Sequence, residues 1–365
     1  MIVGVPKEIK KDETRVALTP GGVEMLSRGG HQVLVERGAG AASGFLDDQY
    51  VGAGAVIVDN AADVFGVADM VVKVKEPLPS EFGYFREGQV LFTFLHLAAA
   101  PALTRALMES KVVGIAYETV QTADGALPLL LPMSEVAGRM AVQIGTRLME
   151  NAFGGKGVLL GGVPGVAPAE VVIVGGGIVG TNAAKIALGL GAHVTVFDIS
   201  GQRLRYLDDV FHGRVTTIVS NPINIAEYAG RADLLVGAVL VPGARAPRLI
   251  SREMVQNMAP GAVVVDVAID QGGCIETIDR VTCHTDPTYL EYDVVHYAVP
   301  NIPAAVGRTA TMALTNATLP YVLELAGKGW EKAVDENQAL AKGINILDGS
   351  ITNQGVAEAL SEFLN

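Results

Sequence analysis

The chain has 365 residues, of which 50% are hydrophobic and 18% are charged, and its formal net charge is −12. This length exceeds one compact core, so we expect two domains, and the low charge content is typical of α/β proteins whose parallel strands are covered on both faces. The acidic balance argues against nucleic acid or an anionic membrane as a partner, since both attract basic surfaces, and favours a small metabolite.

The N-terminal region does not read as a secretory signal, because charged residues from Lys7 onward interrupt it before an apolar core could form. We also find no span of about 20 apolar residues that could cross a bilayer. The two cysteines, Cys274 and Cys283, match neither a disulfide framework nor a metal-binding spacing. We therefore expect a cytoplasmic protein with reduced thiols.

The first 120 residues alternate apolar strand candidates with helical stretches, such as those at 20–28 and 101–110. This alternation predicts an α/β domain. The expected strands are 2–5, 32–36, 55–58, 69–74, 90–95 and 112–116.

Long helical patterns without strand signals cover residues 134–152 and much of 303–343. Because they flank a strand-rich middle region, we expect the chain to enter a second domain and then return to the first. The predicted parts are a substrate domain at 1–128, a Rossmann domain at 129–306, and a return at 307–365 made of C-terminal helices. The fold class is thus α/β, with two doubly wound domains and a cleft between them.

A dinucleotide-binding unit is predicted at residues 171–198, which read VVIVGGGIVGTNAAKIALGLGAHVTVFD. An apolar strand leads into Gly175, Gly177 and Gly180 at GxGxxG spacing. We expect these glycines to allow, in turn, a tight turn, close approach of the backbone to a pyrophosphate, and close packing of helix on strand. The phosphates would lie at the N-terminal amides of that helix. The expected strands of this domain are 171–174, 193–197, 215–219, 233–239, 262–268 and 294–298.

Asp198, at the end of the second strand of this unit, favours NAD over NADP. Its carboxylate can accept hydrogen bonds from both ribose hydroxyls and would repel a 2′-phosphate. Arg203 and Arg205 follow closely and temper this preference, because an arginine is what accommodates the phosphate of NADP.

Polar residues follow several predicted strands, where open α/β sheets bind their ligands. Arg15, Lys75 and His96 follow strands of the first domain, and Asp270 follows one in the second. We expect these groups to meet a nicotinamide across the interdomain cleft. Asp270 could steady a cationic amine there, or it could only cap the turn that follows it.

Arg15, Lys75 and His96 also have simpler, structural interpretations. Arg15 could pair at the surface with Asp12 or Glu13 instead of binding a carboxylate. Lys75 could be a lysine that extends from a strand end to water, and His96 a structural histidine. The remaining histidines serve as comparisons: His31 and His193 open strands at the opposite edge, and His212, His284 and His296 carry no local signal.

Several segments in the same order resemble the alanine dehydrogenase family, which is related to the NAD-binding subunit of proton-translocating transhydrogenase. The resemblance runs along nearly the whole chain. It is carried by GVPKEIKKDETRVALTPGGVEML with Arg15, VKVKEP with Lys75, FTFLHLAA with His96, the glycine fingerprint, VVDVAIDQGG with Asp270, and ALTNATLPYVLELA.

This resemblance implies reversible oxidative deamination of L-alanine by NAD to pyruvate and ammonium, in a cytoplasmic homohexamer. It assigns Arg15 and Lys75 to the substrate, His96 to acid/base catalysis, and Asp270 to assistance at the reacting amine and water. The cofactor contacts that it implies are Ser134, Gly175, Gly177, Ile178, Val179, Gly180, Asp198, Arg203, Ser220, Val239, Leu240, Val267, Ala268, Ile269, Asp270, Val299, Asn301 and Ile302.

The resemblance also suggests a divalent ion held by an acid and a histidine on a late helix, but Glu324 has no histidine near it in this sequence, so we predict no metal. Two other functions remain open. One is a transhydrogenase subunit that passes hydride between nicotinamides and needs a membrane partner, and the other is an NAD-binding module without catalysis.

Overall fold

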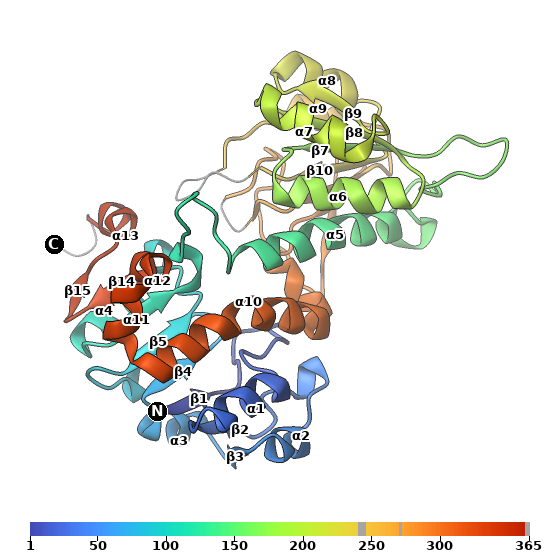
Figure 1. The fold of residues 1–365 in the computed structure, drawn as a ribbon. Helices are drawn as coiled ribbons and strands as arrows, with labels where there is room; N and C mark the ends of the chain where they lie inside the picture. Colours follow the sequence, from blue (N-terminus) through green and yellow to red (C-terminus); the bar gives the residue numbers. More distant parts are fainter. Residues whose placement is uncertain (240–245, 270–271, 362–365) are drawn as a thin grey trace. The chain divides into compact units, whose positions relative to one another are not determined.

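A computed structural model describes residues 1–239, 246–269 and 272–361 (Figure 1). The chain forms two compact units: one comprises Met1–Met133 and Ala304–Asn365, and the other comprises Ser134–Pro303. These limits lie a few residues from the expected boundaries at 128 and 306.

The first unit is built on an eight-stranded sheet with the strand order β15-β14-β6-β5-β4-β1-β2-β3. Strands β1 to β6 are parallel, and β1 pairs with both β2 and β4, so the order reverses at the β1/β4 boundary. Ligands of such sheets bind at this reversal, beside the carboxyl ends of the strands. The parallel strands are β1 (Ile2–Val5), β2 (Gln32–Glu36), β3 (Ala55–Val58), β4 (Met70–Val72), β5 (Val90–Thr93) and β6 (Val113–Ala116).

Helix α1 (Pro20–Arg28) shows how local sequence sets the element ends in this unit. The Thr19 side chain accepts a hydrogen bond from the Gly22 amide at 3.3 Å, and Pro20 occupies the first turn, where no backbone N–H is needed. Gly29 caps the end. These signals were readable in the sequence, and the helix has the predicted bounds. The other helices before residue 131 are α2 (Asp47–Gly52), α3 (Ala61–Val67) and α4 (Pro101–Glu109), with 3-10 turns η1 (Ala41–Ser43), η2 (Pro79–Tyr84), η3 (Leu97–Ala99) and η4 (Tyr117–Thr119).

The C-terminal return is not made of helices alone, so that prediction was wrong. Strands β14 (Ile344–Leu347) and β15 (Ser350–Ile351) form a hairpin, and β14 extends the sheet antiparallel to β6. The connecting Asp348 and Gly349 both have positive φ angles, of 50° and 73°, which is the geometry of a two-residue hairpin turn. The helices of this return are α10 (Gly307–Lys328), α11 (Trp330–Glu336), α12 (Gln338–Gly343) and α13 (Gln354–Ala359), after the 3-10 turn η7 (Ile302–Val306).

Helix α10 packs on α1, so the two ends of the sequence share one unit (Figure 1). Hydrogen bonds reinforce this contact: the Val16 amide donates to Thr311 Oγ1 at 3.1 Å, and Ser43 Oγ lies 2.8 Å from the same atom. One face of the sheet is covered by buried apolar residues from both ends of the chain, namely Phe65, Ala68, Val71, Leu91, Leu95, Leu97, Leu103, Leu107, Val112, Ala116, Ile346, Val356 and Leu360.

The second unit contains a seven-stranded sheet with the order β12-β13-β11-β10-β7-β8-β9. Six strands are parallel, as predicted, and β12 is an additional antiparallel edge strand that the sequence pattern did not reveal. The strands are β7 (Glu170–Val174), β8 (His193–Asp198), β9 (Thr216–Val219), β10 (Leu234–Gly237), β11 (Val263–Asp266), β12 (Thr288–Glu291) and β13 (Val294–Tyr297). The helical elements are α5 (Leu131–Leu148), which begins at the end of the first unit, η5 (Asn151–Phe153), α6 (Ile178–Gly189), α7 (Gly201–Phe211), α8 (Pro222–Ala229) and α9 (Arg252–Gln256).

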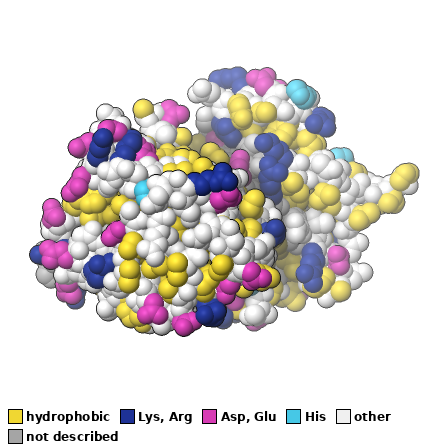
Figure 2. All heavy atoms as spheres, turned by 60° about the horizontal axis from the view of Figure 1, so that its bottom comes forward, with side chains coloured by type: hydrophobic (Ala, Val, Ile, Leu, Met, Phe, Trp, Pro, Cys, Tyr) yellow, Lys and Arg dark blue, Asp and Glu magenta, His cyan; other side chains and the backbone are white. Residues whose placement is uncertain are grey.

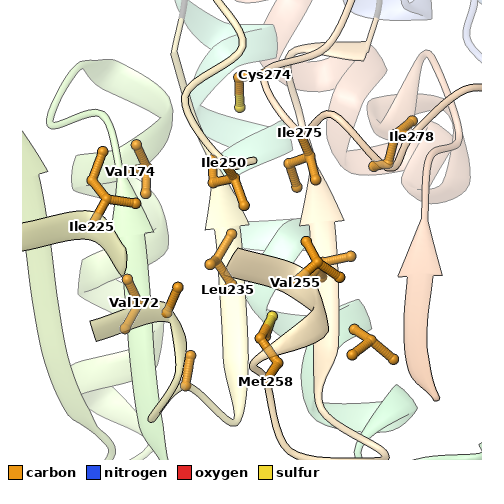
Figure 3. Packing of buried hydrophobic residues seen from close by; sticks show 14 of the residues in the cluster. Val172, Val174, Ile225, Leu235, Ile250, Val255, Met258, Cys274, Ile275 and Ile278 are labelled. Carbon is orange, nitrogen blue, oxygen red and sulfur yellow. The ribbon is translucent and has the colours of Figure 1, made fainter. Parts of the chain in front are cut away.

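The central strands of this sheet are buried throughout, which explains their continuous runs of valine, isoleucine and leucine. Figure 3 shows Val172, Leu235 and Val255 among the side chains that pack on one face, with Cys274 at its edge. On the face shown in Figure 2, charged side chains of both signs are scattered among apolar ones. Among the described residues, every helix is too short or too polar to cross a membrane.

Candidate active site

Three predicted residues of the first unit lie beyond the carboxyl ends of neighbouring strands. Lys75 follows β4, His96 follows β5, and Arg15 lies in the segment between β1 and α1. Since β1, β4 and β5 are adjacent in the sheet, these residues share one edge, at the point where the strand order reverses. The position of these residues directly after predicted strands therefore identified neighbouring parts of the sheet.

Arg15 is buried, with an exposed fraction of 3%. Its Nε and Nη2 donate to the two oxygens of Glu13 at 2.7 and 2.6 Å. Nη1 approaches the Met133 sulfur at 3.0 Å. The alternative of a surface ion pair was right about the partner Glu13 but wrong about the location, because residues far along the chain cover this arginine.

Glu8 ties the loop after β1 to the end of β4. Its Oε1 accepts hydrogen bonds from the amides of Val74 at 2.6 Å and Lys75 at 3.4 Å. Its other oxygen lies 3.4 Å from Nζ of the fully buried Lys73, which also binds Glu81 at 2.9 Å. Burial opposes the charge on Lys73, but the Glu8 and Glu81 carboxylates outweigh it and raise the pKa of this lysine.

Lys75 itself is largely buried, with 9% of its surface exposed. The interpretation as a lysine that extends from a strand end to water is therefore wrong. The main chain of Lys75 is held on both sides, because its carbonyl oxygen accepts from Thr93 Oγ1 at 3.1 Å on strand β5 and its amide donates to Glu8.

His96 adopts a left-handed backbone conformation, with φ of 50°. Its amide donates to Glu118 Oε1 at 2.6 Å, and its ring stacks on Phe94 with centroids 5.8 Å apart. Nδ1 lies 3.2 Å from Oε2 of Glu76. The imidazole is partly exposed, so one face of this histidine is held by the protein while the side chain still reaches solvent.

The glycine loop of the second unit has the geometry that its spacing predicts. Gly175 has φ of 107°, and a Cβ at Gly180 would lie 1.8 Å from the Gly175 carbonyl oxygen. A Cβ at Gly177 would meet nothing within 4 Å. Gly177 caps α6 without a side-chain hydrogen bond, so the first amides of this helix are available to an anion.

Asp198 and Arg203 brace this loop. The Asp198 carboxylate accepts from the amides of Gly176 at 2.9 Å and Ser200 at 2.8 Å. Arg203 donates through Nε to the Gly176 carbonyl oxygen and through Nη2 to Thr181 Oγ1, both at 2.5 Å. These bonds engage Arg203 with the loop backbone. Among the remaining predicted contacts, Ile178, Val179 and Gly180 form the first turn of α6.

Most other predicted cofactor residues follow strands at the carboxyl edge of this sheet. Ser220 follows β9, Val239 follows β10, Val267, Ala268 and Ile269 follow β11, and Val299, Asn301 and Ile302 follow β13, whereas Ser134 lies on α5. A Cβ at Gly175 would lie 2.5 Å from the Ala238 carbonyl oxygen, so the segments after β7 and β10 run close together where the strand order reverses. Leu240 and Asp270 lie outside the described residues.

Sequence reasoning missed several charged residues that hold this site. Glu8, Glu76 and Glu118 each follow a strand of the first sheet, so their positions after predicted strands could have identified them. Glu13 was predicted only as a possible surface partner of Arg15. Among the comparison histidines, His296 is buried between Thr277 Oγ1 at 2.8 Å and the Val294 carbonyl at 2.9 Å, which is a structural arrangement.

Within the described parts of the chain, no three His, Cys, Asp or Glu side chains gather in a way that could hold a metal ion. Glu324 binds Lys328 Nζ and Asn337 Nδ2, each at 2.8 Å. The absence of a metal stays a prediction.

Family profiles match along almost all of the chain. The N-terminal domain of the alanine dehydrogenase/PNT family matches residues 4–137, and the C-terminal domain matches residues 141–354. The chain belongs to this family. The resemblance predicted from the sequence is thereby confirmed.

Curated members of the alanine dehydrogenase/PNT family are similar over nearly their full length. Alanine dehydrogenase of Methanococcus maripaludis is 62% identical over 98% of this chain and 96% of its own. Alanine dehydrogenase of Staphylococcus saprophyticus subsp. saprophyticus is 59% identical over 99% of this chain and 97% of its own. These relatives carry the name of an oxidoreductase.

Solved structures with a similar fold confirm the α/β fold class. A structure titled L-alanine dehydrogenase superimposes with a TM-score of 0.96 at 53% identity, covering 99% of both chains. A transhydrogenase structure from Sinorhizobium meliloti gives a TM-score of 0.82 at 24% identity, covering 97% of this chain and 99% of the other. The second likeness concerns the fold alone.

Proposed function

We propose that this chain catalyses the reversible, NAD-dependent oxidative deamination of L-alanine to pyruvate and ammonium. The observation that carries the proposal is similarity over 98% of the chain, at 62% identity, to a protein named alanine dehydrogenase. In this proposal the first unit binds the substrate and the second unit binds the cofactor.

The glycine loop of the second unit fits NAD. The uncapped amides at the start of α6 suit a pyrophosphate, and the open space at Gly177 lets it come close. Asp198 would accept hydrogen bonds from the ribose hydroxyls with lone pairs that its two backbone donors do not use. The role proposed for the nicotinamide is to accept a hydride from Cα of the substrate.

Arg15 is the proposed ligand of the substrate carboxylate. Glu13 holds two of its nitrogens and so fixes the plane of the guanidinium. The third nitrogen, Nη1, faces the thioether of Met133, which is a weak acceptor compared with a carboxylate. A carboxylate that displaced this sulfur would gain a charge-assisted hydrogen bond in a buried setting.

Lys75 and His96 are the proposed partners of the reacting atoms. The Lys75 ammonium would bind the carbonyl oxygen of pyruvate, and the main-chain bonds at Glu8 and Thr93 set the origin of that side chain. His96 would take a proton from the water that adds to the iminium and return it as the carbinolamine collapses. Asp270 would assist at the amine.

The decisive experiment follows NADH oxidation by the purified chain with pyruvate and ammonium. We expect turnover that needs both substrates and a slower rate with NADPH. Reduction of an NADP analogue by NADH after a membrane transhydrogenase partner is added, without turnover of pyruvate, would instead indicate transhydrogenation. NADH binding without either reaction would indicate a binding module.

The family resemblance also leads us to propose a homohexamer. Light scattering on the purified chain tests this assembly, since a mass of six chains is expected. A monomeric mass together with full activity would remove the hexamer from the proposal while leaving the reaction intact.

A further inference from the structure

His96 lies in a contact that the proposed reaction does not by itself require. Its Nδ1 is 3.2 Å from Oε2 of Glu76, the residue that directly follows Lys75. The Glu76 side chain is only 15% exposed, against 42% for the imidazole. The carboxylate is therefore held within the protein, and the ring extends from it toward solvent.

The second oxygen of Glu76, Oε1, is bound by Lys10 from the loop that follows β1. Each oxygen of this carboxylate thus has its own cationic or imidazole partner. Burial opposes ionisation of Glu76, but the hydrogen bonds with His96 and Lys10 prevail and lower its pKa to about 2. Glu76 is consequently an anion, and only an acceptor, at any pH near neutrality.

The backbone of His96 is also held in place. Its left-handed φ of 50° is an unusual conformation for a residue with a side chain. Glu118 supports this conformation, because its carboxylate accepts from the amides of Leu95 at 3.2 Å and His96 at 2.6 Å. Phe94 stacks on the ring at an interplanar angle of 22°. Together, these contacts fix both the origin and the plane of the imidazole.

We propose that Glu76 is a positioning residue that fixes His96 in the Nδ1-protonated tautomer, so that Nε2 is the nitrogen that exchanges protons with the reacting water. This inference rests on the proposed function. Since the carboxylate can only accept, Nδ1 must carry the proton in the Glu76 contact. In neutral His96 the lone pair is then on Nε2, and in charged His96 both nitrogens donate. Glu76 thereby holds the neutral His96 with Nε2 as the base, and it stabilises the imidazolium that forms when His96 takes up a proton.

The test compares Glu76→Gln with Glu87→Gln as a matched control. Glu87 forms an exposed ion pair with Lys111 and lies away from the candidate site. For E76Q we expect kcat to fall about 10- to 100-fold, because the amide holds either tautomer equally well. The Michaelis constant for NADH should stay within about twofold, and E87Q should match the wild type.

Nitrogen NMR of selectively labelled histidine supplies a readout that a general structural defect would not mimic. We expect the His96 signals, assigned by their loss in His96→Ala, to report the Nδ1-protonated tautomer in the wild type and a mixture in E76Q. Unchanged tautomers in E76Q, or an unchanged kcat, would overturn the proposal.

This measurement also separates the two proposals, since the tautomer is observed without substrate. A wild type that cannot oxidise NADH with pyruvate and ammonium refutes the proposed function, whatever the spectra show. If E76Q does not fold, Glu76→Asp replaces it, because the shorter side chain keeps the negative charge but withdraws the carboxylate oxygen from Nδ1 of His96. For E76D we expect the same changes in tautomer and rate at a smaller size, about threefold in kcat, and unaltered behaviour would contradict the inference.

Discussion

The carboxyl edges of the two sheets are built from different groups. In the first unit, charged side chains occupy the edge: Arg15, Lys75 and His96 with their acidic partners. In the described part of the second unit, glycines and helix amides form the edge beside β7, and Asp198 and Arg203 brace that backbone. A site for a small reacting molecule needs side chains that exchange charge and protons, whereas a pyrophosphate is held well by main-chain amides alone.

The largest effect on turnover is expected for His96→Ala. Loss of the proposed acid/base group should lower kcat by about two to four orders of magnitude, with little change in NADH affinity. His193→Ala is the matched control, because His193 pairs with Glu170 at the opposite edge of the other sheet. Steady-state kinetics and NADH fluorescence check both variants. Near-normal turnover of H96A would show that the edge of the first sheet does not supply the acid/base group.

Arg15→Lys should reduce kcat/KM for pyruvate by about 100-fold, because a lysine cannot reproduce the fork that binds Glu13 and still present a donor to a carboxylate. Arg28→Lys, in an exposed pair with Glu24, should leave the kinetics unchanged. Saturation curves for pyruvate at fixed NADH and ammonium test this pair. Equal kinetics for the two variants would argue that Arg15 has only a packing role.

Two glycine substitutions test the role of the main chain at the edge of the second sheet. Gly177→Ala adds a methyl group in open space, so the fold should be kept while NADH binding weakens about tenfold through the lost approach of the pyrophosphate. Gly180→Ala forces its Cβ against the Gly175 carbonyl, so it should also destabilise the second unit, by about 1–3 kcal/mol. Thermal unfolding and NADH titration distinguish the two. Equal stability of both variants would contradict this account of the loop.

The acidic side chains at the carboxyl edge of the first sheet predict that stability depends on pH. The pKa of Glu76 is lowered from 4.5 to about 2. Its contribution to the free energy of unfolding is therefore complete above pH 4.5 and is lost as the pH falls toward 2. The loss amounts to at most about 3 kcal/mol. Urea unfolding of wild type and E76Q at pH 6 and pH 3 should show a gap that narrows on acidification. E87Q, at an exposed pair, should show no such gap.

The smallest effect is expected from removal of divalent metal. Both oxygens of Glu324 are engaged by Lys328 and Asn337, and the described part of the chain holds no cluster of metal ligands. Dialysis against a chelator should leave activity and thermal stability unchanged, and Mg²⁺ should restore nothing. A chelator-dependent loss of activity that Mg²⁺ reverses would show that the prediction of no metal is wrong.

Much of the fold was predictable because its signals are local. The bounds of α1 follow from Thr19, Pro20 and Gly29, and the parallel strands from buried apolar runs. Our prediction of C-terminal helices missed the hairpin at Asp348 and Gly349, although its turn residues carry a local signal. Strand β12 was not predictable, because its half-exposed residues carry no continuous apolar run.

The candidate site was predictable only to the level of the sheet edge. A strand end places Arg15, Lys75 and His96 in one neighbourhood, and this much follows from topology. The burial of Arg15 depends on Met133, which lies 118 residues away in the sequence. The contact between Glu76 and His96 depends on side-chain directions in two loops. Neither relation has a periodicity that a single sequence could display.

The antiparallel pairing of β14 with β6 has a consequence for biosynthesis. The second unit is one uninterrupted stretch, Ser134–Pro303, so we expect it to fold as soon as it leaves the ribosome. In the first unit, by contrast, the edge of β6 and the surface that α10 covers stay exposed until residues 307–351 have been translated. We expect nascent chains halted before this point to hold a folded second unit and an incomplete first unit.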